Sequence, residues 1–264
     1  MKGNGCRIVE FPGSRLATVD IGALSRRRHT VTALLELDVT GARARLREAR
    51  RANRERVSFT GWLVRTIAAT VRQHPQVAAF RHGRRKLVVF DEVAVSVVVE
   101  KELDGDRVPI PLVIRQAADK TGAAITAEIE DAKAERLGRG QAVLGQRGNP
   151  LARLYYFLPG ALRRLVWRVM LSHPRFVFRQ MGNVAVTSLG TIGRIDGWFI
   201  HTSVHPLSIG IGSVIPRPVA AGAEVRTGEI LRLTVLVDHD VVDGAPMARF
   251  IQALSANVEG GLGL

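Results

Sequence analysis

Several residue types are scarce in this chain of 264 residues, and each shortage excludes a class of protein. Cys6 is the only cysteine, so no disulfide can form within the chain, and a reducing cytoplasm is the expected location. No apolar run approaches the roughly 18 to 20 residues needed to cross a bilayer. The residues that follow Met1 are not an apolar signal core, so export is not expected.

Lysine is scarce as well, and arginine carries nearly all of the formal charge of +14. Such a surface attracts anions, among them nucleic acid, acidic lipid and the phosphates of a cofactor. The fork of a guanidinium group suits phosphate because it offers two parallel hydrogen bonds. The clusters Arg26–Arg28 and Arg50–Arg51 are not accompanied by a helix-turn-helix, a zinc finger or an aromatic RNA-binding motif, so a nucleic-acid partner is not expected.

The sequence predicts no metal site. His201 and His205 have a spacing that metal ligands can have, but no cysteine and no pair of carboxylates accompanies them. Ordinary polar contacts are therefore expected of both rings. The glycine-rich segment 190–197 lacks the GK[ST] that a phosphate-binding P-loop requires.

The order of apolar patterns predicts α+β layers rather than a regular βαβ series. Polar residues of one parity over 29–39 indicate a strand with one wet face. Thr40 and Ser58 are suited to cap the two helices that follow. Further strands are expected over 86–90, 93–100, 108–114, 184–187, 206–214 and 231–237, and further helices over 117–136 and 246–258.

Residues 138–181 differ in composition from the rest of the chain and contain a basic amphipathic helix after Pro159-Gly160. Its apolar stripe consists of Leu162, Leu165, Val166, Val169 and Met170. Three interpretations are open: packing of the stripe on the same domain or on a neighbouring subunit, a lid over an apolar channel, and binding to an anionic membrane surface. We favour the first.

A histidine stands where a predicted strand gives way to the last helix. The strand over 231–237 delivers His239 to its end, and a side chain there can project into a cleft while its backbone is held. An unperturbed histidine has a pKa of about 6.5 and can act as a general base at neutral pH. Asp243 is close enough to hold the turn, and Gly244 would permit a sharp reversal. From these residues alone, a structural and a catalytic histidine weigh equally.

Four ordered segments resemble the catalytic domain of the 2-oxo-acid dehydrogenase (dihydrolipoamide) acyltransferases. Residues 238–245 are similar to the family's DHRxxDGA motif, and 184–193 to its strand with SNLGxxG. Residues 93–115 resemble its hairpin with a VPVIR-like end, and 34–40 its EVDVT strand end. The resemblance implies a chloramphenicol acetyltransferase-like fold, an α+β two-layer sandwich with a mixed β-sheet and packing helices. We expect a single catalytic domain over 1–264, with 138–181 as an insertion.

The resemblance also implies an acyltransferase that moves an acyl group between a thioester and a thiol or another acceptor. His239 matches the family's base, and Thr187 matches the serine whose hydroxyl stabilises the oxyanion, with Ser188 as the fallback. Asp243 is implied to hold the active-site loop. Substrate contacts are expected from Ser188, Gly190 and Gly244. The thioester would belong to coenzyme A, or to a lipoyl group supplied in trans, and no metal is implied.

Two further features bear on this resemblance. Asp240 stands where the family has arginine, and the sequence contains no lipoyl or subunit-binding domain. Because the family's active sites lie between the subunits of a trimer, a homotrimer or a larger assembly is implied. The alternative is a catalytically inactive scaffold of the same family, or a basic binding module.

Overall fold

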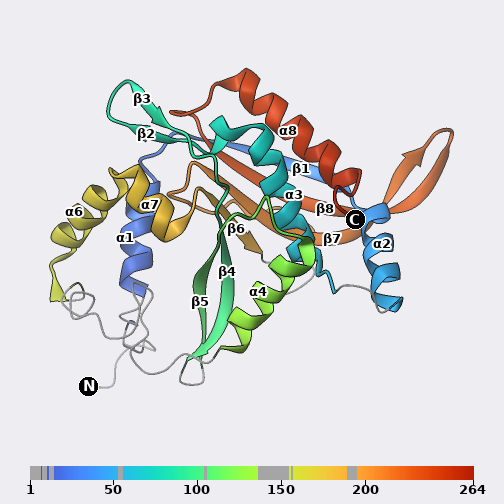
Figure 1. The fold of residues 1–264 in the computed structure, drawn as a ribbon, viewed down its shortest axis with the longest axis horizontal. Helices are drawn as coiled ribbons and strands as arrows, with labels where there is room; N and C mark the ends of the chain where they lie inside the picture. Colours follow the sequence, from blue (N-terminus) through green and yellow to red (C-terminus); the bar gives the residue numbers. More distant parts are fainter. Residues whose placement is uncertain are drawn as a thin grey trace.

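The structure is a computed structural model that describes residues 15–52, 56–103, 106–135, 157–188 and 195–264, together with Arg7, Phe11 and Tyr155. Its main sheet has six strands in the order β1-β8-β7-β6-β4-β5 (Figure 1). The sheet is mixed, because β6 pairs in parallel with β4 and β7 while the other pairs are antiparallel. The strands are β1 (Thr30–Asp38), β4 (Val95–Leu103), β5 (Asp106–Ile114), β6 (Val184–Ser188), β7 (Leu207–Ala221) and β8 (Glu224–Asp238).

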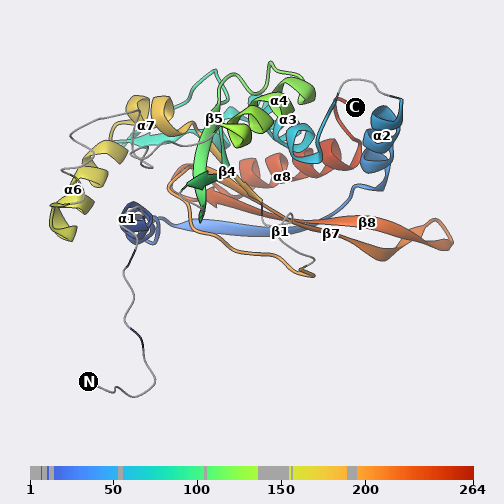
Figure 2. The same ribbon diagram turned by 90° about the horizontal axis from the view of Figure 1, so that it is seen from below.

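Helices α3 (Phe59–Gln73), α4 (Gly122–Ala134) and α8 (Gly244–Glu259) cover one face of this sheet, as Figure 2 shows. Helix α2 (Thr40–Arg51) lies at one end of that layer. A 3₁₀ turn, η1 (Pro75–Ala78), leads from α3 to a small second sheet of β2 (Phe80–His82) and β3 (Lys86–Val88). The helices form one layer and the mixed sheet the other, as expected for the predicted sandwich.

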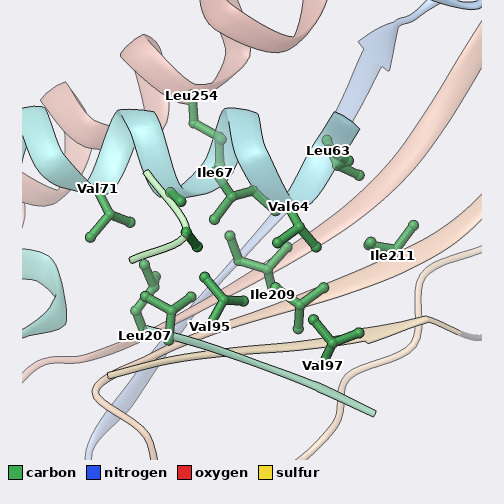
Figure 3. Packing of buried hydrophobic residues seen from close by; sticks show 14 of the residues in the cluster. Leu63, Val64, Ile67, Val71, Val95, Val97, Leu207, Ile209, Ile211 and Leu254 are labelled. Carbon is green, nitrogen blue, oxygen red and sulfur yellow. The ribbon is translucent and has the colours of Figure 1, made fainter. Parts of the chain in front are cut away.

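The core lies between α3 and the sheet (Figure 3). Helix α3 repeats apolar side chains at intervals of three and four residues, so one face of the helix turns towards the strands. Ser58 begins this helix by accepting a hydrogen bond from Gly61 N at 3.0 Å, which confirms the predicted cap. The buried side chains that meet there include Leu63, Ile67, Val95, Val97, Leu207, Ile209 and Leu254.

The sequence patterns predicted the positions of most helices and strands. In β1 the side chains of Thr30, Thr32 and Glu36 are exposed, so the predicted wet face is confirmed. The cap predicted at Thr40 is wrong. Val39 is the cap residue, while the Thr40 hydroxyl donates to Asp38 Oδ1 at 2.5 Å and accepts from Glu229 N at 2.8 Å. This threonine therefore connects the end of β1 to β8.

Strands β7 and β8 are much longer than predicted, with 15 residues each. Their extra residues form a hairpin that projects from one end of the molecule (Figure 1). The residues near its tip are exposed, so they lack the apolar alternation on which the prediction depended. Gly222 has a φ of 67° at the tip, a conformation that favours glycine.

Helices α1 (Arg15–Ser25) and α7 (Pro174–Met181) were not predicted, and both accompany α6 (Gly160–Leu171) at the end of the molecule away from the hairpin (Figure 1). Asp20 of α1 is 1% exposed and accepts hydrogen bonds from Tyr155 Oη and Arg163 Nε, both at 2.7 Å. Trp167 Nε1 donates to Tyr155 Oη at 2.9 Å. Burial and then Asp20 raise the pKa of Tyr155 to about 12, so the phenol remains a donor.

These contacts correct one half of the favoured interpretation of the insertion helix, packing of the stripe on the same domain, and leave packing on a neighbouring subunit as a prediction. Helix α6 docks on its own chain through Trp167 and Arg163, with Met170 partly buried beside them. The remaining members of the predicted stripe are exposed, so the stripe does not pack on the same domain. They are Leu162, Leu165, Val166 and Val169.

We predict that Asp20→Ala releases α6 from α1. The change leaves the Arg163 guanidinium without its buried carboxylate, a loss of about 3 kcal/mol or more for a broken buried pair. Limited trypsin digestion with mass spectrometry should show faster cleavage after Arg163 and Arg164. Asp119→Ala, which removes an exposed partner of Arg72, is the matched control and should leave this cleavage unchanged. Equal cleavage rates in the two variants would contradict the prediction.

Candidate active site

The backbone on either side of His239 is held while its side chain is exposed. Strand β8 ends at Asp238, which pairs with Thr30 of β1. His239 N donates to His29 O at 2.8 Å, and Asp240 N donates to Asp238 Oδ1 at 3.1 Å. The His239 side chain therefore projects from a fixed strand end, as the sequence predicted.

A buried ion pair secures this strand end. Arg28 Nη1 lies 2.5 Å from Asp238 Oδ2, and Asp238 is only 6% exposed. The pair connects the entry to β1 with the exit from β8. Removing one partner of such a pair leaves the other charge buried and uncompensated, which is costly.

Asp240, the acid that stands in place of the arginine of the resembling family, contacts a histidine and an arginine. Its Oδ1 lies 2.9 Å from His29 Nδ1, and its Oδ2 lies 3.5 Å from Arg81 Nη1. The hydrogen bond with Asp240 raises the pKa of His29, and the same bond lowers the pKa of Asp240. His29 thus contacts the turn twice, through its carbonyl to His239 and through its ring to Asp240.

Asp243 and Gly244 form the start of α8. Asp243 is the cap residue, but its exposed side chain makes no capping hydrogen bond. Gly244 does not have a positive φ, and a Cβ there would meet nothing within 4 Å. Gly244 permits the reversal, as predicted, but a residue with a Cβ would fit there as well. The open space does leave the Gly244 backbone accessible to another molecule.

Thr187 and Ser188 end β6 and face opposite sides of the sheet. Ser188 shares its parity with Val186, which is buried under the helices. Thr187 pairs with Gly210 of β7, whose missing Cβ would lie 3.1 Å from the rings of Phe199 and His201. The Thr187 side chain therefore lies on the face away from the helices. Gly190, the third residue predicted in this segment, lies outside the described residues.

The register of the strands keeps Thr187 and His239 of one chain apart. Thr187 pairs with Gly210, and Gly210 pairs with Thr234. His239 is five residues beyond Thr234, which corresponds to about 16 Å along β8, and the two strand spacings add about 10 Å across the sheet. One chain therefore does not bring the predicted base and the predicted hydroxyl together.

A pocket of about 190 Å³ lies below the His239 turn, lined in part by Arg28, Asp238 and two histidines. His205 Nε2 donates to Met181 O at 2.9 Å, and His201 Nε2 lies 2.6 Å from Ser208 Oγ. Burial lowers the pKa of each histidine to about 4, so both rings are neutral at pH 7. In the part of the chain that the structure describes, no three His, Cys, Asp or Glu side chains gather as a metal site.

Arg28, His29 and Arg81 belong to this site, and their sequence context did not indicate it. Arg28 was grouped with an arginine cluster, and Arg81 stands in β2, far from His239 along the chain. Only the position of Arg28 and His29 directly before a strand could have suggested a role. Their partners on β8 become apparent only once β1 and β8 are paired.

We predict that acid destabilises the fold through the two buried histidines. In the unfolded chain these histidines bind protons at a pKa of about 6.5, whereas in the folded chain the rings stay neutral down to about pH 4. As the pH is lowered from about 6.5 to about 4, each histidine therefore lowers the free energy of unfolding by about 1.4 kcal/mol per pH unit. Urea denaturation at a series of pH values should show a shallower slope in His205→Gln, whose amide keeps a donor for Met181 O. His173→Gln, at an exposed histidine, is the control. An unchanged slope in His205→Gln would contradict the assignment.

Comparison with known sequences identifies relatives of this chain. The sequence model described as 2-oxoacid dehydrogenases acyltransferase (catalytic domain) matches residues 24–141 and 179–261. The lipoamide acyltransferase component of the branched-chain alpha-keto acid dehydrogenase complex of Pseudomonas aeruginosa is 26% identical over 229 residues, which cover 85% of this chain and 45% of that protein. The chain thus spans about half the length of this curated relative.

Solved structures share the fold. A probable dihydrolipoamide acetyltransferase from Listeria monocytogenes has a TM-score of 0.71 at 19% identity, over 97% of this chain and 96% of that one. For the Azotobacter vinelandii dihydrolipoamide acetyltransferase the TM-score is 0.67 at 20% identity, over 96% and 92%. Chloramphenicol acetyltransferase gives 0.51 at 12% identity, over 97% and 99%. The predicted chloramphenicol acetyltransferase-like fold is confirmed.

Proposed function

The chain belongs to the family of 2-oxoacid dehydrogenase acyltransferase catalytic domains, and we propose that it transfers an acyl group between a thioester and a thiol or another acceptor. The observation that carries this proposal is the His239 turn. Its imidazole is exposed at the end of a central strand, and the neighbouring backbone amide is hydrogen-bonded to His29 O at 2.8 Å. A base whose backbone is held can meet a substrate with little reorganisation.

In the proposed reaction His239 takes the proton from the thiol of the acceptor. The thiolate attacks the thioester carbonyl, and the tetrahedral intermediate carries its negative charge on oxygen. The Thr187 hydroxyl donates a hydrogen bond to this oxyanion. When the intermediate collapses, the C–S bond to the departing thiolate breaks, and the imidazolium returns its proton to that sulfur. The substrates are coenzyme A thioesters or lipoyl groups supplied in trans, and we infer no metal.

Two observations favour Thr187 over Ser188 as the oxyanion donor. Thr187 lies on the face away from the helix-covered core, while Ser188 has the parity of core residues. The Azotobacter vinelandii enzyme was investigated for the role of a serine and a histidine in its catalytic mechanism, and these two residues are 52 positions apart. Thr187 and His239 are also 52 positions apart, since 239 − 187 = 52. Ser188 and Gly244 stay proposed substrate contacts beside this pair.

We further propose that the active site forms between copies of this chain. The strand register separates Thr187 from His239 within one chain, so a complete site needs the hydroxyl of one subunit and the imidazole of another. A homotrimer is the smallest assembly that fits the family, and larger ones are compatible with it. The exposed Asp243 side chain is then available to a neighbouring subunit.

A catalytically inactive scaffold is the second candidate function. It is favoured by Asp240, which stands in place of the family's arginine. If the protein is an active acyltransferase, the contacts of Asp240 with His29 and Arg81 balance the charge of Asp240 and hold the turn. Binding of coenzyme A, measured by calorimetry, distinguishes the candidates because a scaffold need not bind it. We propose one catalytic domain over 1–264, with 138–181 inserted, in a reducing cytoplasm.

We predict that His239→Ala abolishes acyl transfer and leaves the fold and the assembly intact. Loss of a general base lowers the rate by about 10²- to 10⁴-fold. The assay is chromatographic measurement of free coenzyme A formed from a series of acyl-coenzyme A chain lengths with dihydrolipoamide as acceptor, because the transfer replaces one thiol by another and leaves the total number of free thiols unchanged. Circular dichroism and sedimentation report the fold and the mass. His173→Ala, at an exposed histidine, is the control. Full activity in His239→Ala would remove the base assignment.

We also predict complementation between two inactive variants. Thr187→Val keeps the shape of the side chain and removes its hydroxyl, and His239→Ala removes the base. When the two variants are co-expressed and purified as mixed assemblies, some interfaces combine a native Thr187 with a native His239, so activity should return to about a quarter of the wild-type value if mixing is random and each site needs both residues. No recovery in mixed assemblies of verified composition would show that the site is not shared between subunits.

A further inference from the structure

Helix α6 carries an apolar stripe that its own chain does not cover. Leu162, Leu165, Val166 and Val169 follow the spacing i, i+3, i+4 and i+7, so they line one side of the helix. All four are exposed, Val169 to 53%, and Phe157 just before the helix is exposed to 85%. The docked side of α6 is a different one, formed by Arg163 and Trp167.

The segment of the chain that contains this stripe is basic and has no acidic residue of its own. No Asp or Glu occurs between Glu135 and Asp196, while ten arginines do. Arg164 and Arg168 are one helical turn apart on α6, both are exposed, and neither forms an ion pair with a described residue. An apolar stripe bordered by exposed guanidinium groups is the pattern of a helix that lies in the interface of an anionic bilayer.

The position of α6 suits such a contact. The helix lies at the edge of the molecule, beside α1 and away from the helix layer that covers the sheet (Figures 1 and 2). Its orientation is held by the buried Asp20, so the stripe is presented in a fixed direction rather than by a loose segment. None of the helices in the described part of the chain has the length and apolarity to span a bilayer. A contact with lipid through α6 would therefore be one that lies on the surface.

We propose that the stripe of α6 binds the surface of an anionic lipid bilayer, with Arg164 and Arg168 on the headgroup phosphates. Charge decides between the occupants. In a contact between two stripes, the exposed Arg164 and Arg168 of one copy would come close to those of the other, whereas anionic headgroups complement them. The sequence model of the family leaves residues 142–178 unmatched, so α6 lies outside the part of the chain that this model describes. The proposal does not depend on the proposed acyl transfer.

The test is flotation of the full chain with two kinds of vesicle, one of equal parts phosphatidylglycerol and phosphatidylcholine and one of phosphatidylcholine alone. We expect binding to the anionic vesicles only. Leu165→Ser with Val169→Ser should weaken it roughly tenfold or more, because two exposed apolar anchors are lost. Arg164→Gln with Arg168→Gln should weaken it by about 10- to 30-fold, since each basic residue near such a surface contributes about 1 kcal/mol.

Arg50→Gln with Arg51→Gln is the matched control, because these exposed arginines lie on α2 and the variant loses the same charge. Equal weakening in this control would overturn the proposal and show attraction by net charge alone. Undiminished binding of the serine variant to the anionic vesicles would also overturn the proposal. If that variant stayed bound and duplex DNA displaced it at the same salt, the binding would be attraction of a basic surface to any polyanion, which would overturn it too. So would a lower sedimenting mass of the serine variant, which would identify the stripe as an interface between copies. Circular dichroism melting verifies that every variant is folded.

Discussion

The pairing of β8 on both of its edges is the constraint on which the rest of this structure depends. Backbone hydrogen bonds to β1 and β7 determine where β8 ends, and they determine the position of Thr187 on β6 through Gly210. A slip by one residue would turn every side chain of a strand to the other face of the sheet. The exposure of His239, the outward face of Thr187 and the separation of the two within one chain all follow from this register.

Charge pairs then convert a strand end into a defined turn. The buried pair of Arg28 with Asp238 joins β1 to β8 just before His239, and His29 binds the residue just after it. Asp240 is therefore not an isolated acid beside the proposed base, because His29 and Arg81 contact its carboxylate. The same short stretch of chain continues from α1, which holds α6 through Asp20. The His239 turn and the stripe of α6 are therefore connected through α1 and the few residues between α1 and β1.

Much of the fold was predictable because short-range patterns report burial. The parity of β1, the cap at Ser58 and the strand of Val184–Ser188 were recognisable from side chains a few residues apart. The prediction was wrong or silent where an element depends on distant partners. Helix α1 is held by Asp20 against residues of the insertion, and the outer half of the β7–β8 hairpin is exposed and has no apolar alternation.

The sequence by itself determined the family, the strand that carries His239 and the apolar stripe of α6, because each is written in residues that are neighbours along the chain or one helical turn apart. Only the tertiary structure decided which side of α6 is docked, which side chains contact Asp240 and how far Thr187 lies from His239. Arg81 and Asp240 are 159 positions apart, and a contact of that kind depends on strand pairing and layer packing. The residues next to Arg81 or Asp240 along the chain do not indicate this contact, because it exists only in the folded chain.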